Sequence, residues 1–126
     1  MILGDVSGKG IEAASMSALV KTALTAYAWE GAGPARMARS LNSMLMGFSR
    51  VETFVTAFIA KIDLKAGRAT YCSAGHPPTM VIRPESMPLG GGEARGGEVE
   101  LLGCQSGVIG AFESMVTRRV PLRSPR

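Results

Sequence analysis

The chain has 126 residues, which is enough for one domain or part of one and too few for two. Hydrophobic residues make up 46% of it, a content typical of a globular domain, and no apolar run approaches the roughly 20 residues of a membrane span. The formal charge of +4 is spread along the chain and aromatic residues are scarce, so we expect no nucleic-acid partner. The opening residues lack the basic flank of a signal peptide. We therefore expect a soluble, cytoplasmic domain with no membrane segment, unless a longer parent protein anchors it.

The first half of the chain predicts two amphipathic helices. Residues 1–4 are typical of the end of a strand, and a helix is expected from residue 10 or 11 to about Trp29. Its apolar residues recur at helical spacing and form one stripe: Met16, Leu19, Val20, Ala23, Leu24 and Tyr27. A GAGP segment ends this helix, and Pro34 is well placed to begin a second one with the same spacing. The short link predicts an antiparallel pair.

The pattern then changes to that of strands. Residues 54–62 are rich in aromatic and β-branched residues and are apolar on both faces, which predicts a central strand covered on both sides. A turn at 63–67 leads to a returning strand at 68–74, and another short strand is expected at 79–83. These elements predict an α+β fold, with an antiparallel helix pair on an antiparallel sheet.

The last third of the chain is less regular. Residues 84–97 are rich in glycine and show no periodicity, which predicts a flexible loop. Two further strand candidates, 99–102 and 115–122, flank a GVIGAF turn region. We interpret the arginines near the end as part of a solvated, frayed terminus: Arg118, Arg119, Arg123 and Arg126.

Few residues in the chain are able to bind a metal. Cys72 and Cys104 are too few for a disulfide framework and lack metal-ligand spacing, so we interpret both as buried small hydrophobic residues. Among ten acidic residues only Asp5 and Asp63 are aspartates, and His76 is the single histidine. This inventory limits the metal chemistry that the chain can perform alone.

The segment GDVSGKGIEAA, residues 4–14, raises the question of which charge it binds. A nucleotide phosphate loop needs the pattern G-x-x-x-x-G-K-[ST]. Leu3 stands where the first glycine would be, and Gly10 stands in place of the hydroxyl residue after Lys9. The motif fails at both ends, so an anion cradle of this type is not expected.

A cation site fits the same segment better. An aspartate just past a strand end, such as Asp5, directs its carboxylate out of the sheet, while adjacent backbone carbonyls remain exposed. Gly8 and Gly10 allow the chain to turn sharply away from an ion. Alternatively, Asp5 only caps the turn or the helix. Spacing alone leaves both interpretations open.

The segment GDVSGKGIEAA, followed by FVTAFIAKIDLKAGRATYCSAGHPP, resembles the SpoIIE-type branch of the PPM phosphatases, the bacterial relatives of protein phosphatase 2C. The first stretch is similar to the family's G-D-V-S-G-[HK]-G element, and the second to its strand–turn–strand ending in A-G-H-P-P. The resemblance covers almost the whole chain, most weakly from residue 84. It implies that residues 1–126 are a single partial domain, cut at both ends, of a four-layer αββα sandwich.

The resemblance also implies roles for individual residues. Asp5 matches the aspartate that bridges two divalent metals, Mn²⁺ or Mg²⁺, and Val6 matches the position whose backbone carbonyl completes the coordination of one of them. Three glycines would form the turn at this site: Gly4, Gly8 and Gly10. His76 lies in the A-G-H-P-P loop, where we expect a structural hydrogen bond rather than catalysis. Lys9 replaces a histidine of many relatives, and we expect it to be solvated rather than to face a phosphate.

The chain departs from the family in the number of its aspartates. Four usually build the binuclear site, and the resemblance places only Asp5 here, with one expected before Met1 and two after the last residue. Asp63 lies in the predicted hairpin turn and cannot substitute. We therefore expect little or no phosphatase activity from this chain itself. Missing strands also predict self-association through exposed sheet edges.

The function implied by the resemblance is that of a metal-dependent serine/threonine phosphatase domain of a bacterial signalling protein. Relatives often act on phosphorylated STAS-domain antagonists of anti-sigma factors, which suggests a partner of that class. The alternative is a degenerate phosphatase that acts as a non-catalytic, protein-binding regulatory module. A third reading is a plain α+β domain whose glycine turn is only structural.

Overall fold

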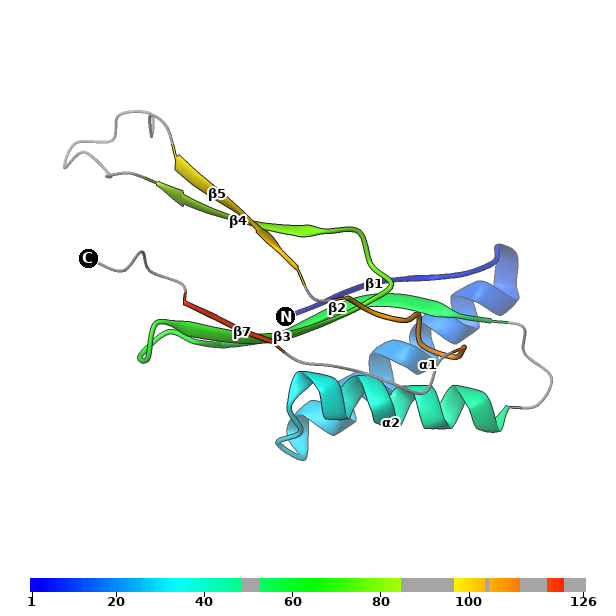
Figure 1. Ribbon diagram of the computed structural model, residues 1–126. Helices are drawn as coiled ribbons and strands as arrows, with labels where there is room; N and C mark the ends of the chain where they lie inside the picture. The colour runs from blue at the N-terminus through cyan, green and yellow to red at the C-terminus, as the bar shows by residue number, and fades with distance from the viewer. Residues whose placement is uncertain (49–52, 85–96, 104, 112–117, 122–126) are drawn as a thin grey trace.

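The computed structural model describes residues 1–48, 53–84, 97–103, 105–111 and 118–121. In this part of the chain two helices cover one face of a sheet, and a two-stranded hairpin lies on the opposite side of that sheet (Figure 1). The helices are α1 (Gly10–Trp29) and α2 (Pro34–Gly47). The strands are β1 (Ile2–Val6), β2 (Val55–Asp63), β3 (Arg68–Ala74), β4 (Thr79–Pro84), β5 (Gly97–Leu102), β6 (Gln105–Ser106) and β7 (Arg118–Pro121). The α+β class is confirmed.

Both predicted helices form at the predicted places. Val20 and Leu24 of α1 are buried, and three other members of the predicted stripe are partly buried in the same cluster: Met16, Ala23 and Tyr27. Leu19 is 37% exposed, because α1 runs beside β1, an end strand of the described sheet, and only part of its stripe meets other elements. On the outer side, hydroxyls bond to carbonyls one turn earlier, as from Ser15 to Ile11.

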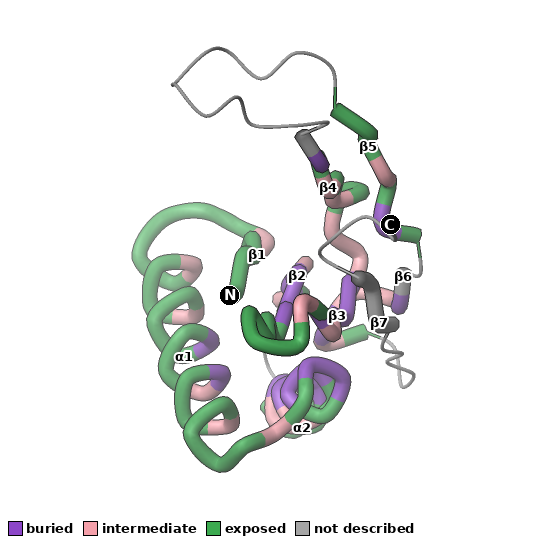
Figure 2. Tube along the Cα trace, turned by 90° about the vertical axis from the view of Figure 1, so that its left-hand side faces the viewer, coloured by how far each residue is buried: buried purple, intermediate pink, exposed green. Residues whose placement is uncertain are grey.

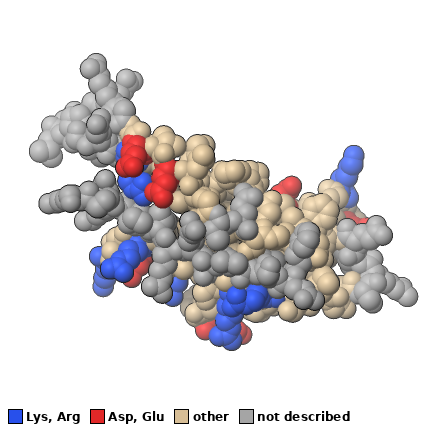
Figure 3. Space-filling view, in the orientation of Figure 1, with Lys and Arg blue, Asp and Glu red and all other residues tan. Residues whose placement is uncertain are grey.

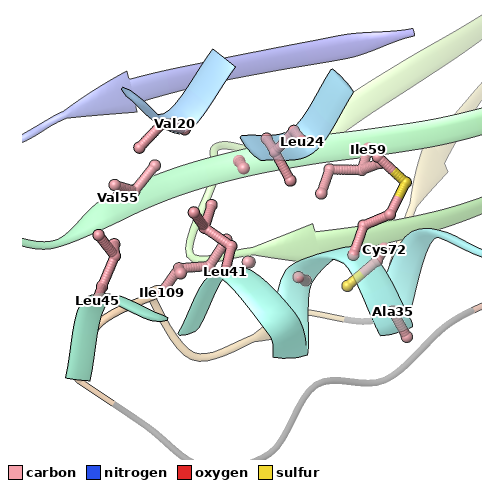
Figure 4. Packing of buried hydrophobic residues seen from close by; sticks show 13 residues of the cluster. Val20, Leu24, Ala35, Leu41, Leu45, Val55, Ile59, Cys72 and Ile109 are labelled. Atoms are coloured by element: carbon pink, nitrogen blue, oxygen red, sulfur yellow. The ribbon is translucent and has the colours of Figure 1, made fainter. Parts of the chain in front are cut away.

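The main core lies between the helices and the sheet. Figure 4 shows Val20 and Leu24 from α1 and Leu41 and Leu45 from α2 directed toward the same space as Val55, Ile59 and Cys72 of the strands. Burial is concentrated along this contact, whereas the far sides of the helices are exposed (Figure 2). Cys72 is buried as predicted, whereas Cys104 lies outside the described residues.

The central strand β2 organises the sheet. It pairs antiparallel with β1 on one side and with β3 on the other. Its residues alternate between two cores: Ile59 packs toward the helices, whereas Phe58 and Ala60 join a second cluster with Tyr71 and Leu102. Leu102 belongs to β5, so this second cluster fixes the β4–β5 hairpin above the sheet. The sequence predicted a strand covered on both faces at 54–62. The structure confirms this strand as β2, which begins and ends one residue later.

The segment after β5 was not predicted in detail, and it completes the sheet. The short strand β6 pairs parallel with β3, and Ile109 forms a bridge with Val55 through two backbone hydrogen bonds of 2.9 Å. The buried Asn42 of α2 accepts a 2.6 Å hydrogen bond from the backbone N–H of Gly110. This side-chain contact ties the segment to α2 across 68 positions of sequence, a connection that no local pattern indicates.

Several predicted boundaries were wrong. The first strand runs to Val6 rather than ending at residue 4, because its pairing with β2 continues to that point. Arg118 and Arg119, expected in a solvated terminus, lie in β7, whose backbone pairs with β3. The strand predicted at 115–122 is described only as Arg118–Pro121. Most of the predicted loop 84–97 lies outside the described residues, as do Arg123 and Arg126. Neither helix of the described chain is long and apolar enough to span a membrane.

The pairing of β1 with β2 depends on a close backbone approach at Gly4. A Cβ at this position would lie 2.9 Å from the carbonyl oxygen of Thr56. We expect Gly4→Ala to lower the free energy of unfolding by about 1–3 kcal/mol, because backbone atoms must shift to admit the methyl group. Chemical denaturation measures this loss. Gly47→Ala is the matched control, since a Cβ at Gly47 meets no atom within 4 Å, and an equal loss in both variants would contradict the prediction.

Candidate metal-binding site at the edge of the sheet

Asp5 lies within β1, paired directly with Thr56 of β2. The prediction that it follows the strand end was therefore wrong, and its backbone belongs to the ladder. The side chains of directly paired residues stand on the same face of a sheet. Since Val55 and Ala57 on either side of Thr56 pack toward the helices, Thr56 and Asp5 stand on the opposite face. Asp5 is exposed there, so its carboxylate is open to solvent.

The register also decides where the Val6 carbonyl points. Met1 and Ala60 exchange backbone hydrogen bonds of 2.8 and 2.9 Å, and the Ser7 N–H donates to the Phe54 carbonyl at 2.9 Å. Odd-numbered residues of β1 are thus the hydrogen-bonded pairs, and even-numbered residues turn their N–H and C=O groups away from β2. The Val6 carbonyl therefore points out of the open side of β1. No strand of the described chain pairs with β1 on that side.

Ser7 closes the strand next to these two oxygens. Its N–H donates to the Phe54 carbonyl, and its Oγ accepts the Phe54 N–H at 2.9 Å. The side chain thus takes the place of the Ser7 carbonyl in the ladder and ends the regular pairing. Gly8 and Gly10 follow with φ of 105° and 80°, backbone conformations that favour glycine. The chain turns there into α1, with Lys9 at the N-cap position.

A groove of about 880 Å³ lies beside this turn. It is lined by the turn, by the first part of α1 and by the start of β2, including Lys9, Ile11, Glu12 and Phe54. Asp5 does not line this groove; it lies on β1, just before the turn. Lys9 is exposed, as predicted, so its ammonium group is available to an anion entering the groove.

The fold brings the single histidine of the chain close to Asp5. The Nδ1 atom of His76 lies 3.1 Å from Oγ1 of Thr56, the residue paired with Asp5. Asp5, Thr56 and His76 are far apart in sequence and come together only through the pairing of β1 with β2 and the turn after β3. The structural hydrogen bond expected for His76 is present, and half-burial of the ring is consistent with that role.

The second aspartate lies elsewhere. Asp63 is seven residues along β2 from Thr56, which corresponds to roughly 23 Å at about 3.3 Å per residue. Its Oδ1 accepts the Ala66 N–H at 2.9 Å and stabilises the β2–β3 turn. The described residues contain no group of three His, Cys, Asp or Glu side chains that could hold a metal ion.

Asp5 and Val6 offer the type of ligand that a hard divalent cation prefers, but fewer ligands than such a cation needs. A carboxylate and a carbonyl are oxygen ligands of the type that Mg²⁺ and Mn²⁺ prefer. Mg²⁺ takes about six ligands in octahedral geometry, so these two oxygens would leave most positions to water or to other groups. The described chain therefore offers part of a site.

Figure 3 shows the charged side chains of the described residues on one face of the molecule. On the face shown in Figure 3, the basic side chains of the described residues lie at separate places and are interspersed with acidic ones. Arg83 of β4 and Glu100 of β5 form an ion pair of 2.7 Å on the hairpin.

Sequence reasoning missed the contacts that support this region. Ser7 accepts the Phe54 N–H through its side chain, and Thr56 contacts the side chain of His76. Neither residue type by itself predicts such a contact. The sequence offered one usable signal, Asn42, which is a polar residue within the apolar stripe of the second helix and is buried in the structure.

Three comparisons place the chain among known proteins. A family model described as Stage II sporulation protein E (SpoIIE) matches residues 1–122. The chain is 30% identical over 94 residues to the phosphoserine phosphatase RsbU of Bacillus subtilis, which covers 75% of this chain and 28% of that protein. A crystal structure of the RsbU and RsbW domains of Rv1364c from Mycobacterium tuberculosis superposes with a TM-score of 0.72 at 22% identity. It covers 97% of this chain and 31% of that one, so this chain spans about a third of either relative or less.

The contact between Thr56 and His76 is testable through stability. We expect Thr56→Val and His76→Ala to be coupled by about 0.5–1.5 kcal/mol in a double-mutant cycle of unfolding, because each removes one partner of the same hydrogen bond. Thr70→Val is the matched control, because Thr70 is a half-buried threonine of β3 whose hydroxyl has no bond to any described residue. Its loss of stability should simply add to that of His76→Ala. Additive losses for Thr56→Val and His76→Ala would contradict the contact.

Proposed function

The chain belongs to the SpoIIE family, and from this membership we propose that it forms the Asp5-bearing part of a metal-dependent phosphatase domain that hydrolyses phosphoserine or phosphothreonine in a protein. Its curated relative RsbU is a phosphoserine phosphatase. The observation that carries the proposal is the position of Asp5 and Val6. Their carboxylate and outward-facing carbonyl border the same open edge, within the segment that resembles the family's metal-binding element.

In this proposal Asp5 and the Val6 carbonyl are ligands of a divalent cation, Mn²⁺ or Mg²⁺. A pair of such ions supplies a water of lowered pKa and neutralises charge on the phosphoryl oxygens. The protein contributes position: the Asp5–Thr56 pairing fixes the carboxylate, and the two hydrogen bonds between Ser7 and Phe54 fix the strand end beside the Val6 carbonyl. Gly8 and Gly10 turn the chain away from this edge of the described sheet.

The groove beside the turn suits a protein substrate. It combines apolar side chains such as Ile11, which is 84% exposed, with the cationic Lys9. A phosphorylated segment with apolar flanking residues would match both. By family resemblance we propose a phosphorylated STAS-domain antagonist of an anti-sigma factor as the partner, and bacterial sigma-factor regulation as the pathway.

We also propose that the 126-residue chain does not catalyse this reaction by itself. It carries one of the four aspartates of the family's binuclear site, and Asp63 is held in a distant turn. The alternative function is a non-catalytic binding module, for which the single aspartate of this segment would suffice without a complete metal site. Metal binding at Asp5 distinguishes the two.

Paramagnetic broadening by Mn²⁺ detects even a weak site of this kind. In an NMR titration we expect Mn²⁺ to broaden the amide signals of residues 4–7 and of Thr56 first, because these lie nearest the Asp5 carboxylate. Asp5→Asn should abolish this broadening. Asp63→Asn is the matched control, since its carboxylate lies in the β2–β3 turn, and it should leave the broadening at residues 4–7 unchanged. Equal broadening at residues 4–7 in wild type and Asp5→Asn would favour the binding module.

Turnover gives a separate measurement. With Mn²⁺ and a generic aryl phosphate, we expect the 126-residue chain to hydrolyse no more substrate than its Asp5→Ala variant. The reason is that each missing ligand leaves a water in place and the ion weakly held. Measurable hydrolysis that is lost in Asp5→Ala would show that the chain is active alone.

A further inference from the structure

The face of the sheet that carries Asp5 also carries two side chains that bond to each other. Thr56 is paired directly with Asp5, and its Oγ1 lies 3.1 Å from Nδ1 of His76. Asp5 and Thr56 are a hydrogen-bonded pair of the antiparallel ladder, so their Cβ atoms lie about 5.5 Å apart on the same face. Because β2 lies between β1 and β3, Thr56 stands between His76 and the carboxylate that the proposed function assigns to a metal.

The turn that carries His76 is fixed on both sides. Before it, Gly75 adopts a φ of 60°, its N–H donates to the Ser106 carbonyl at 2.9 Å, and a Cβ there would collide with Val108. After it, two prolines disfavour a helical backbone at His76. The imidazole itself is half-buried. This support holds Nδ1 beside the Thr56 hydroxyl, as a positioning role requires.

The hydrogen bond between His76 and Thr56 has two proton arrangements. If Nδ1 carries a proton, His76 donates to Oγ1, and the hydroxyl proton of Thr56 is left for another acceptor. If Nδ1 carries none, Thr56 donates to the ring and has no proton for Asp5. A carboxylate only accepts hydrogen bonds, and it attracts the positive end of a hydroxyl dipole. Asp5 therefore favours the arrangement with the proton on Nδ1.

We propose that His76 and Thr56 position the Asp5 carboxylate for metal binding. The Nδ1–H of His76 donates to Thr56, and the Thr56 hydroxyl donates to the Asp5 oxygen that is turned away from the cation. This inference deepens the proposed function and rests on it, because it assigns positioning residues to the same site.

The exposure of Asp5 gives this hydrogen bond a purpose. Among the described residues its carboxylate accepts no hydrogen bond, so the side chain is free to rotate. Across a Cβ separation of about 5.5 Å, rotation toward Thr56 brings one oxygen within reach of the hydroxyl. A ligand held in this way has already lost rotamer freedom that a cation would otherwise have to remove.

Nitrogen-15 NMR of the imidazole locates the proton in the metal-free chain. His76 is the single histidine, so its ring signals need no further assignment. In the neutral ring, which the two nitrogen shifts identify, we expect Nδ1 to carry the proton. A neutral ring protonated at the other nitrogen would make Thr56 the donor. That result overturns this inference whether or not a metal binds, and it leaves the proposed function standing.

Titration with Mn²⁺ measures the effect on the site. We expect the Mn²⁺ concentration that halves the amide signals of residues 4–7 to rise on the order of ten-fold in Thr56→Val, because a ligating carboxylate loses its outer hydrogen bond. Thr56→Ser keeps a hydroxyl and should bind Mn²⁺ nearly as wild type does. Thr70→Val is the matched control and should change nothing, since Thr70 lies in the part of β3 next to the β2–β3 turn. If Thr56→Val binds like wild type while Asp5→Asn abolishes the broadening, this inference fails and the proposed function stands.

Combined variants test whether His76 acts through Thr56. His76→Ala alone should raise the same Mn²⁺ concentration. In the Thr56→Val background it should add no further change, because the hydroxyl that it orients is absent. Additive effects would contradict the chain of hydrogen bonds, and circular dichroism checks that each variant is folded. Wild-type broadening at residues 4–7 that does not depend on Asp5 would overturn the proposed function and this inference together.

Discussion

The antiparallel pairing of β1 with β2 is the interaction on which the rest of the structure depends. It places Asp5 opposite Thr56, and through Thr56 it connects Asp5 to His76 in the turn after β3. It also fixes which backbone groups of β1 are consumed in the ladder and which point outward. A shift by one residue would turn Asp5 toward the helices and would turn the Val6 carbonyl into the ladder. The positions of both proposed metal ligands thus follow from this register.

The two faces of β2 explain why this register is well defined. Val55, Ala57 and Ile59 are buried under the helices, whereas Phe58 and Ala60 are buried against β3 and the β4–β5 hairpin. Because both faces are apolar and covered, sliding the strand would disturb two cores at once. Gly4 also favours this register, since only a residue without a Cβ fits so close to the Thr56 carbonyl. A glycine of the motif that was expected to serve a metal site therefore serves strand pairing first.

The glycines of the turn have a different role from Gly4. Gly8 and Gly10 adopt positive φ, so they bend the chain from the sheet edge into α1. Their effect is to end β1 abruptly, so that Asp5 and Val6 lie at the edge of the described sheet, next to a groove lined in part by Lys9. The end of β1, the turn and the start of α1 therefore all lie within the segment 4–14. The proposal that the chain supplies one edge of a phosphatase site is based on family membership together with this arrangement.

The sequence by itself determined the two helices, the central strand, the hairpin that follows it and the family, because each leaves a local pattern or a contiguous motif. It also identified Asp5 and Val6 as the candidate ligands. Only the tertiary structure decided that Asp5 is a ladder residue and that His76 bonds to Thr56. The same holds for Asn42, which binds Gly110, and for β7, which contains Arg118 and Arg119. These contacts join residues distant in sequence, and their geometry depends on strand register, which is set by burial on both faces of the sheet rather than by any local preference.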